Sequence, residues 1–112
     1  MVHVTIRKDD AGRYFGFEMK GHAEYSEEGS DIVCAAVSML SINTANAIET
    51  LTDTPFKVTA DEKNKGSLQL ELPEGSDDKS GLLMESYELG IRGVMDAYNG
   101  KKTYVSMKIA KV

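Results

Sequence analysis

The chain has 112 residues, a formal net charge of −5, 41% hydrophobic residues and 28% charged residues, which is the balance of one globular domain, 1–112, with a modest core. The negative charge argues against direct nucleic-acid binding, which needs clustered Lys and Arg, and suits a basic protein or peptide partner. One Cys excludes an intramolecular disulfide, and with only two His it argues against a zinc site, so we expect no metal and no cofactor.

The N-terminal residues run straight into a strand pattern, without the apolar run of a signal peptide. No apolar stretch is expected to approach the roughly 20 residues that a membrane span needs. We therefore expect a cytoplasmic protein without membrane contact, in which a lone thiol stays reduced.

Two alternating segments open the chain and predict a β-hairpin around a turn at 9–12. The side chains expected to face the core are Val2, Val4, Ile6, Phe15, Phe17 and Met19. His3 falls on the polar face of the first strand, so we interpret it as a surface histidine.

A polar loop follows the hairpin and leads into an apolar helix. Gly21 ends the second strand, and the loop 23–30 has no apolar periodicity. A helix is predicted over about 32–51, with Asp31 as its N-cap and Ser30 as the alternative.

Cys34 falls in the first turn of this predicted helix, where the positive end of the macrodipole favours a thiolate. His22 lies directly before the loop in the sequence. If the fold brings this histidine beside the thiolate, the two side chains form the base and nucleophile of a cysteine hydrolase. The alternative is that Cys34 has no catalytic role and is a small hydrophobic residue beside the core face. Ser38, one turn later, is expected to be a small packing or hydrogen-bonding residue near the site.

The wording of 21–38 resembles the ribosomal-processing cysteine protease family (Prp): Gly-His-Ala, an acidic loop, then Gly-Ser-Asp-Ile-Val-Cys-Ala-Ala-Val-Ser. The resemblance implies that His22 and Cys34 are the catalytic pair. It also implies a substrate, the N-terminal extension of ribosomal protein L-twenty-seven, cut after an aromatic residue and before a small one. A homodimer is implied as well.

The acidic loop has two interpretations, a solvated segment or a lid over Cys34 that orders on substrate. Its residues of interest are Glu24, Tyr25, Glu27 and Glu28. In the lid interpretation the carboxylates would suit basic residues downstream of the cut. Asp31 has a supporting role, mainly as the cap; its charge opposes a nearby thiolate, and it could instead orient His22.

The second half of the chain predicts another hairpin, from 56–60 and 68–72, then a helix over 78–98 and a last strand over 103–110. Gly90 and Gly93 are costly inside a helix, so we expect them to pack closely against Ser41 and Ala45 of the first helix.

The order β-β-α-β-β-α-β with alternating strands predicts an α+β two-layer sandwich: a largely antiparallel five-stranded sheet with two helices on one face. The open face carries residues that could serve a dimer, namely Tyr14, Thr59 and Tyr104.

The leading functional hypothesis is a cysteine endopeptidase in which Cys34 attacks the scissile carbonyl and His22 later protonates the leaving amine. Free N–H groups at the helix start could stabilise the oxyanion. The alternative is a non-catalytic peptide-binding or ribosome-assembly module of the same fold. A thiol redox sensor is weaker, because the chain has no resolving Cys.

Overall fold

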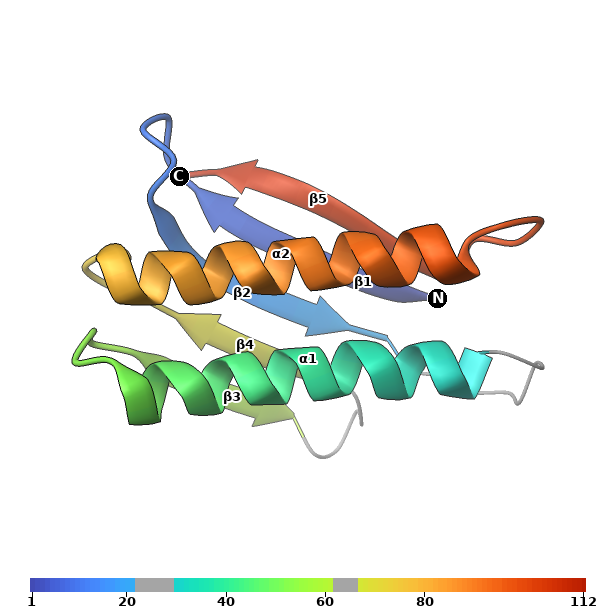
Figure 1. Cartoon of the computed structure of the whole chain (residues 1–112), viewed down its shortest axis with the longest axis horizontal. Coiled ribbons are helices and arrows are strands. Elements are labelled where there is room, and N and C mark those ends of the chain that lie inside the picture. The colour runs from blue at the N-terminus through green and yellow to red at the C-terminus, as the bar shows by residue number, and fades with distance from the viewer. Residues whose placement is uncertain (22–29, 62–66) are drawn as a thin grey trace.

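The computed structural model describes residues 1–21, 30–61 and 67–112, and the side chains of 32–61 within the second range. Its elements follow the predicted order: β1 (Val2–Lys8), β2 (Tyr14–Lys20), α1 (Ser30–Leu51), β3 (Lys57–Asp61), β4 (Ser67–Glu71), α2 (Asp78–Tyr98) and β5 (Val105–Lys111). Both helices lie on one face of a five-stranded sheet (Figure 1). The predicted two-layer α+β sandwich is confirmed.

The sheet has the strand order β3-β4-β2-β1-β5. The ladders β1–β2 and β3–β4 are antiparallel, as the two predicted hairpins require, and an antiparallel ladder β2–β4 joins the hairpins. The remaining ladder joins β1 to β5 in parallel, so the sheet is mixed but largely antiparallel. α2 lies over the β1 side of the sheet and α1 over the β4 and β3 side (Figure 1).

The helices cover the central strands and leave the edges of their face uncovered. One row of paired side chains crosses the whole sheet: Ile109, Ile6, Phe17, Leu70 and Val58. The three central members are buried, whereas Val58 is 41% exposed and Ile109 is 43% exposed. β3 and β5 therefore leave these apolar side chains exposed, because two helices are too narrow to span five strands.

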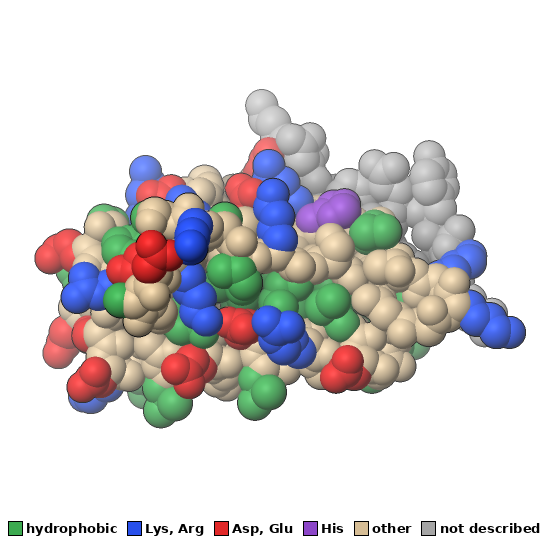
Figure 2. Space-filling view, turned by 90° about the horizontal axis from the view of Figure 1, so that it is seen from above, with side chains coloured by type: hydrophobic (Ala, Val, Ile, Leu, Met, Phe, Trp, Pro, Cys, Tyr) green, Lys and Arg blue, Asp and Glu red, His purple; other side chains and the backbone are tan. Residues whose placement is uncertain are grey.

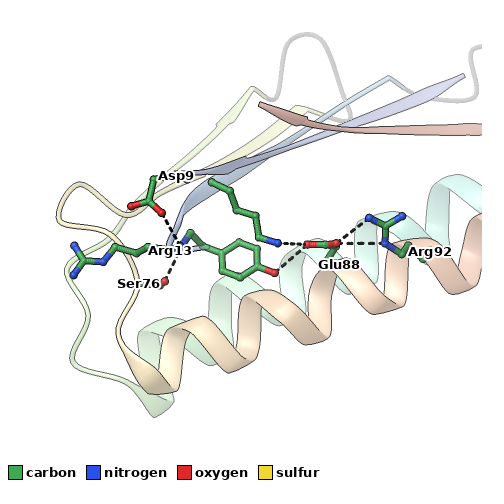
Figure 3. Close-up of polar contacts among 7 residues, drawn as sticks. Asp9, Arg13, Ser76, Glu88 and Arg92 are labelled. Atoms are coloured by element: carbon green, nitrogen blue, oxygen red, sulfur yellow. Dashed lines mark hydrogen bonds and ion pairs between the residues drawn. The ribbon is translucent and has the colours of Figure 1, made fainter. Parts of the chain in front are cut away.

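Tyr14 corrects the predicted facing of β2. The register of β1 and β2 shifts between Arg7 and Lys8, which turns Tyr14 into the core and leaves Phe15 half-buried. The Tyr14 hydroxyl donates to Glu88 Oε1 of α2 at 2.9 Å (Figure 3). Tyr14 therefore does not belong to the open sheet face on which a dimer contact was expected.

Glu88 of α2 has three partners, of which Lys8 and Tyr14 belong to the hairpin and Arg92 to α2 itself. Lys8 Nζ lies 3.3 Å from Oε1 and 4.6 Å from the Tyr14 ring centroid, and Arg92 donates to Oε2 at 2.9 Å (Figure 3). Burial raises the pKa of Glu88, but the hydrogen bonds from Arg92, Tyr14 and Lys8 outweigh it, and the net pKa is lowered.

α1 contains a stretch that is long and apolar enough for a membrane span, against expectation: Ile32–Leu51, with a mean hydropathy of 1.4. Length and composition alone give this result. Val33, Val37 and Ile48 are fully buried in the core cluster. Apolar residues on the side away from the core, such as Met39, add to the hydropathy. In this fold α1 is a core helix.

α2 spans the predicted residues, and Asp77 caps it by accepting from the backbone N–H groups of Lys79 and Ser80. The expected packing of the two glycines is only partly right. A Cβ on Gly90 would lie 3.0 Å from Leu40 of α1, while a Cβ on Gly93 would meet nothing within 4 Å. The missing side chain of Gly90 therefore lets α1 approach α2 closely. The residue of α1 that contacts Gly90 is Leu40, and not Ser41 or Ala45 as expected.

Candidate active site

Cys34 is the fifth residue of α1, because the helix begins at Ser30. The predicted start was two residues later, so Asp31 lies within the first turn and is not the N-cap. Ser30 is also helical, and the alternative cap is wrong too. Cys34 thus stands about one turn from the helix start, close to the positive end of the macrodipole.

The Cys34 side chain is half-buried. It packs against the core cluster. Leu40, about 120° around the helix from Cys34, is the residue that reaches Gly90 of α2. A helix turns about 100° per residue, so Cys34, Ser38 and Ser41 share one flank of α1.

A buried polar layer lies beneath this flank. Ser38 Oγ lies 4.0 Å from Met19 Sδ, and Ser41 Oγ lies 3.6 Å from the same sulfur. Ser41 also donates to the Val37 carbonyl at 2.8 Å, and its hydroxyl is 2.8 Å from the Tyr87 hydroxyl. These contacts tie β2 and both helices together at one level of the core.

Tyr87 belongs to this layer through both its hydroxyl and its ring. The ring stacks on Phe17 with centroids 4.2 Å apart. Burial raises the pKa of Tyr87 to about 12, against the hydrogen bond with Ser41, which lowers it. Tyr87 is therefore a neutral structural hydroxyl at physiological pH.

Met19 connects this layer to the segment of His22. It is the second-last residue of β2, two positions before Gly21. Gly21 has a φ of +107°, and a Cβ there would collide with the carbonyl oxygen of Met1, so the chain leaves the strand through a position that only glycine fits.

His22 lies outside the described residues, as do Glu24, Tyr25, Glu27 and Glu28 and the side chain of Asp31. The structure thus places Cys34 and Ser38 on one flank, with the end of β2 leading into His22. Met19 and Tyr87 also contact this layer, and the sequence did not predict them as part of the site. The alternation of a strand and the apolar stripe of a helix predict only that such residues are in the core. Among the described residues no three His, Cys, Asp or Glu side chains gather as a metal site would require.

The other histidine stands apart from this flank. His3 is exposed, as predicted, and its Nδ1 lies 2.6 Å from Ser106 Oγ on the neighbouring strand. Figure 2 shows the histidine at the surface, with acidic and basic side chains interspersed over the same view.

Comparison with known proteins places this geometry in context. The family model described as cysteine protease Prp matches residues 1–103. The ribosomal processing cysteine protease Prp of Bacillus subtilis (strain 168) is 31% identical over 103 residues, covering 88% of this chain and 90% of the relative.

Solved structures show the same fold. The Prp protease of S. aureus, crystallised with a covalently linked product peptide, has a TM-score of 0.84 at 26% identity, covering 98% of this chain and 100% of that one. SMU.848 from Streptococcus mutans has a TM-score of 0.84 at 35% identity, covering 100% of this chain and 96% of that one.

Proposed function

The chain belongs to the family of the cysteine protease Prp, and we propose that this protease removes the N-terminal extension of ribosomal protein L-twenty-seven. The observation that carries the proposal is the position of Cys34, half-buried about one turn into α1. The named activity of the B. subtilis relative, ribosomal processing, supports the substrate class.

In the proposed mechanism, Cys34 Sγ attacks the scissile carbonyl carbon, and the carbonyl oxygen takes the negative charge. His22, as imidazolium, pairs with the thiolate and then protonates the leaving amine, so that an acyl-enzyme remains. Water, deprotonated by the now neutral His22, releases the product acid and restores the thiol. Backbone N–H groups of the first turn of α1 are free of helical partners and suit the oxyanion.

The direct test incubates the protein with an extended L-twenty-seven precursor and reads the product masses. We expect one cut, after an aromatic residue and before a small one. Cys34→Ala should keep the fold and lose cleavage, and Cys34→Ser should lose it as well, because the serine hydroxyl is far harder to ionise than the thiol. Turnover retained by Cys34→Ala would overturn the nucleophile assignment.

A second experiment tests the role of His22. His22→Ala should abolish turnover and slow alkylation of Cys34 by iodoacetamide near neutral pH, because the cationic partner of the thiolate is removed. An unchanged alkylation rate across pH, with cleavage lost, would assign His22 to proton delivery or substrate placement instead.

The acidic loop is proposed to attract basic residues of the precursor. Replacing Glu24, Glu27 and Glu28 by Gln should raise KM, blunt its dependence on salt and leave kcat little changed. An unchanged KM would contradict this role.

We further propose a cytoplasmic homodimer. Thr59 and Tyr104 remain of the residues expected to form the dimer contact. α2 adds two exposed leucines, Leu82 (68%) and Leu89 (72%), which lie two helical turns apart on the same side of the helix. They border a hollow of about 500 Å³ that Lys8 and Tyr14 also line. Light scattering should give twice the chain mass, and Leu82→Ser with Leu89→Ser should lower it if α2 is the contact.

A further inference from the structure

One side chain bridges the connection between α2 and β5. Asn99 directly follows α2, and its backbone N–H closes the helix by donating to the Met95 carbonyl at 2.8 Å. Its half-buried side chain spans 100–104: Oδ1 accepts from the backbone N–H groups of Tyr104 at 2.8 Å and Val105 at 3.2 Å, and Nδ2 donates to the Val105 carbonyl at 2.8 Å. We call these three side-chain hydrogen bonds the Asn99 clamp.

The Asn99 clamp uses both ends of the amide. Its partners are two N–H donors and one carbonyl acceptor, so the amide oxygen faces the donors and the amide nitrogen faces the acceptor. A carboxylate of the same shape could accept both hydrogen bonds but has no N–H to donate. The clamp therefore depends on an amide, and it fixes the position at which β5 begins at Val105.

From β5 the contacts continue to the exit of β2. The Tyr104 carbonyl accepts from the Val2 N–H at 2.9 Å, and Val2 pairs with Val105 in the parallel ladder of β1 and β5. The residue before Val2, Met1, places its carbonyl oxygen so close to Gly21 that a Cβ there would collide with it. Direct contacts thus lead from the clamp through the starts of β5 and β1 to the residue that follows β2.

This path lies at the end of the molecule that carries the proposed catalytic pair. The end of α2, the start of β5, the end of β2 and the start of α1 are all found there (Figure 1). His22 is the next residue after Gly21, and Cys34 is the fifth residue of α1. A change in the position of Gly21 is therefore passed directly to the backbone of His22.

We propose that Asn99 is a positioning residue for the protease reaction: the clamp holds Val2 and Met1, and Met1 holds the exit of β2 from which His22 follows. Asn99 acts through the backbone and not on the substrate. Proton transfer depends on geometry, and a misplacement of about 1 Å can cost about a hundredfold in rate. Substrate binding does not involve the clamp, so we expect the effect on kcat. This inference rests on the proposed protease function and adds a residue to its catalytic geometry.

The sharpest test is Asn99→Asp, which exchanges the amide NH2 group for an oxygen at nearly constant shape. It keeps an acceptor for both N–H groups, loses the donor and sets a carboxylate oxygen against the Val105 carbonyl. On an extended L-twenty-seven precursor we expect kcat to fall about tenfold with KM little changed. Asn99→Ala, which removes all three bonds without adding a charge, should lose at least as much. Wild-type kcat in either variant would overturn the inference and leave the protease function intact.

Thr54→Ala provides a control for the loss of stability alone. The Thr54 hydroxyl lies within hydrogen-bond distance of Asp77 Oδ2 and Ser80 Oγ at the start of α2, which Figure 1 shows at the opposite end of the molecule. Thr54→Ala should lower the free energy of unfolding and leave kcat and KM at wild-type values. An equal fall of kcat in Thr54→Ala and Asn99→Asp would show a general effect of destabilisation, which overturns the positioning role.

A second readout needs no turnover. The Gly21 amide resonance in an NMR spectrum reports the contact with Met1, and hydrogen exchange of the Val2 amide reports its bond to the Tyr104 carbonyl. Asn99→Asp should shift the Gly21 resonance and speed exchange at Val2, while the stability control should leave both unchanged. An unchanged Gly21 resonance would overturn the path from the clamp to the site, even where kcat falls. Failure of the wild-type protein to cut the precursor would instead overturn the proposed function, and with it the catalytic role of the clamp.

Discussion

Ser41 and Tyr87 join α1 to α2 through hydroxyl oxygens 2.8 Å apart, in the buried layer that also holds the Met19 sulfur. Ser41 already donates to the Val37 carbonyl, so the Tyr87 hydroxyl is the natural donor to Ser41. Because both groups are buried, each depends on the other to satisfy its hydrogen-bonding capacity. This pair fixes the height of α1 relative to α2 two turns from Cys34.

Removing either hydroxyl should cost stability unequally. Tyr87→Phe deletes one neutral hydrogen bond, worth about 1 kcal/mol, whereas Ser41→Ala leaves the buried Tyr87 hydroxyl without its acceptor and should cost about 1–3 kcal/mol. Urea unfolding measures both, and the double variant should cost less than the sum of the single ones. A strictly additive double variant would show that the pair is not coupled.

The same tyrosine predicts an alkaline limit to stability. The pKa of Tyr87 is raised from 10.0 to about 12 in the folded chain, so its contribution is fully present below pH 10 and is lost as the pH rises toward 12. Tyr87→Phe should therefore lose less stability than the wild-type chain between pH 10 and 12. Parallel unfolding curves over that range would contradict the assignment.

Asp77 predicts an acid limit. The hydrogen bond from Thr54, followed by the helix-start N–H of Ser80, lowers the pKa of Asp77 from 3.8 to about 2. A depressed pKa contributes stability above pH 3.8 that is lost as the pH falls toward 2. Asp77→Asn keeps an acceptor for the cap, so its melting temperature should fall less over that interval than that of the wild-type chain. An identical fall in both proteins would place the titration elsewhere.

Met19 is expected to position α1 through its sulfur. Met19→Leu conserves volume and should cost little stability, less than about 1.5 kcal/mol, but it removes the sulfur that lies against the Ser38 and Ser41 hydroxyls. We expect kcat to fall severalfold with KM unchanged. Met84→Leu is the control, since Met84 is also fully buried but lies in the first half of α2. Equal kcat values for the two variants would show that the sulfur has only a packing role.

The glycines of α2 predict a graded gain in stability. Gly93→Ala meets open space and should stabilise the chain by about 1 kcal/mol through helix propensity. Gly90→Ala must push the end of Leu40 by a few tenths of an ångström, so its gain should be smaller or negative. Thermal melts of the two variants decide the order, and a larger gain at Gly90 would contradict the contact.

Local signals predicted much of this fold. The 3.6-residue pattern with Asp77 at its start gave the observed bounds of α2, and alternation gave both hairpins. Alternation could not show that Val58 and Ile109 are exposed, because a period of two reports the side of a sheet and not whether a helix covers it. Tyr14 was misplaced by a register shift that leaves no mark on composition.

The site was predicted less completely, for a related reason. Cys34 and Ser38 were predicted on one side of a helix, which the sequence displays directly, and their roles in the site stay predictions. Met19 and Tyr87 reach the same level only through pairing between distant segments, and the parallel contact of β1 with β5 is equally long-range. The asparagine after α2 shows this as well, since Asn99 Nδ2 donates to the Val105 carbonyl at 2.8 Å and so fixes how β5 begins.

Gly21 sets a limit on sequence variation just before His22. In a saturation library every other residue at this position must push the Met1 carbonyl aside and adopt an unfavourable φ, so we expect only glycine to survive selection for activity. Gly93 and Gly100, which face open space, should accept many residues in the same library. The number of residue types accepted at each position would then be lowest at Gly21, directly after β2, and high at Gly93 and Gly100.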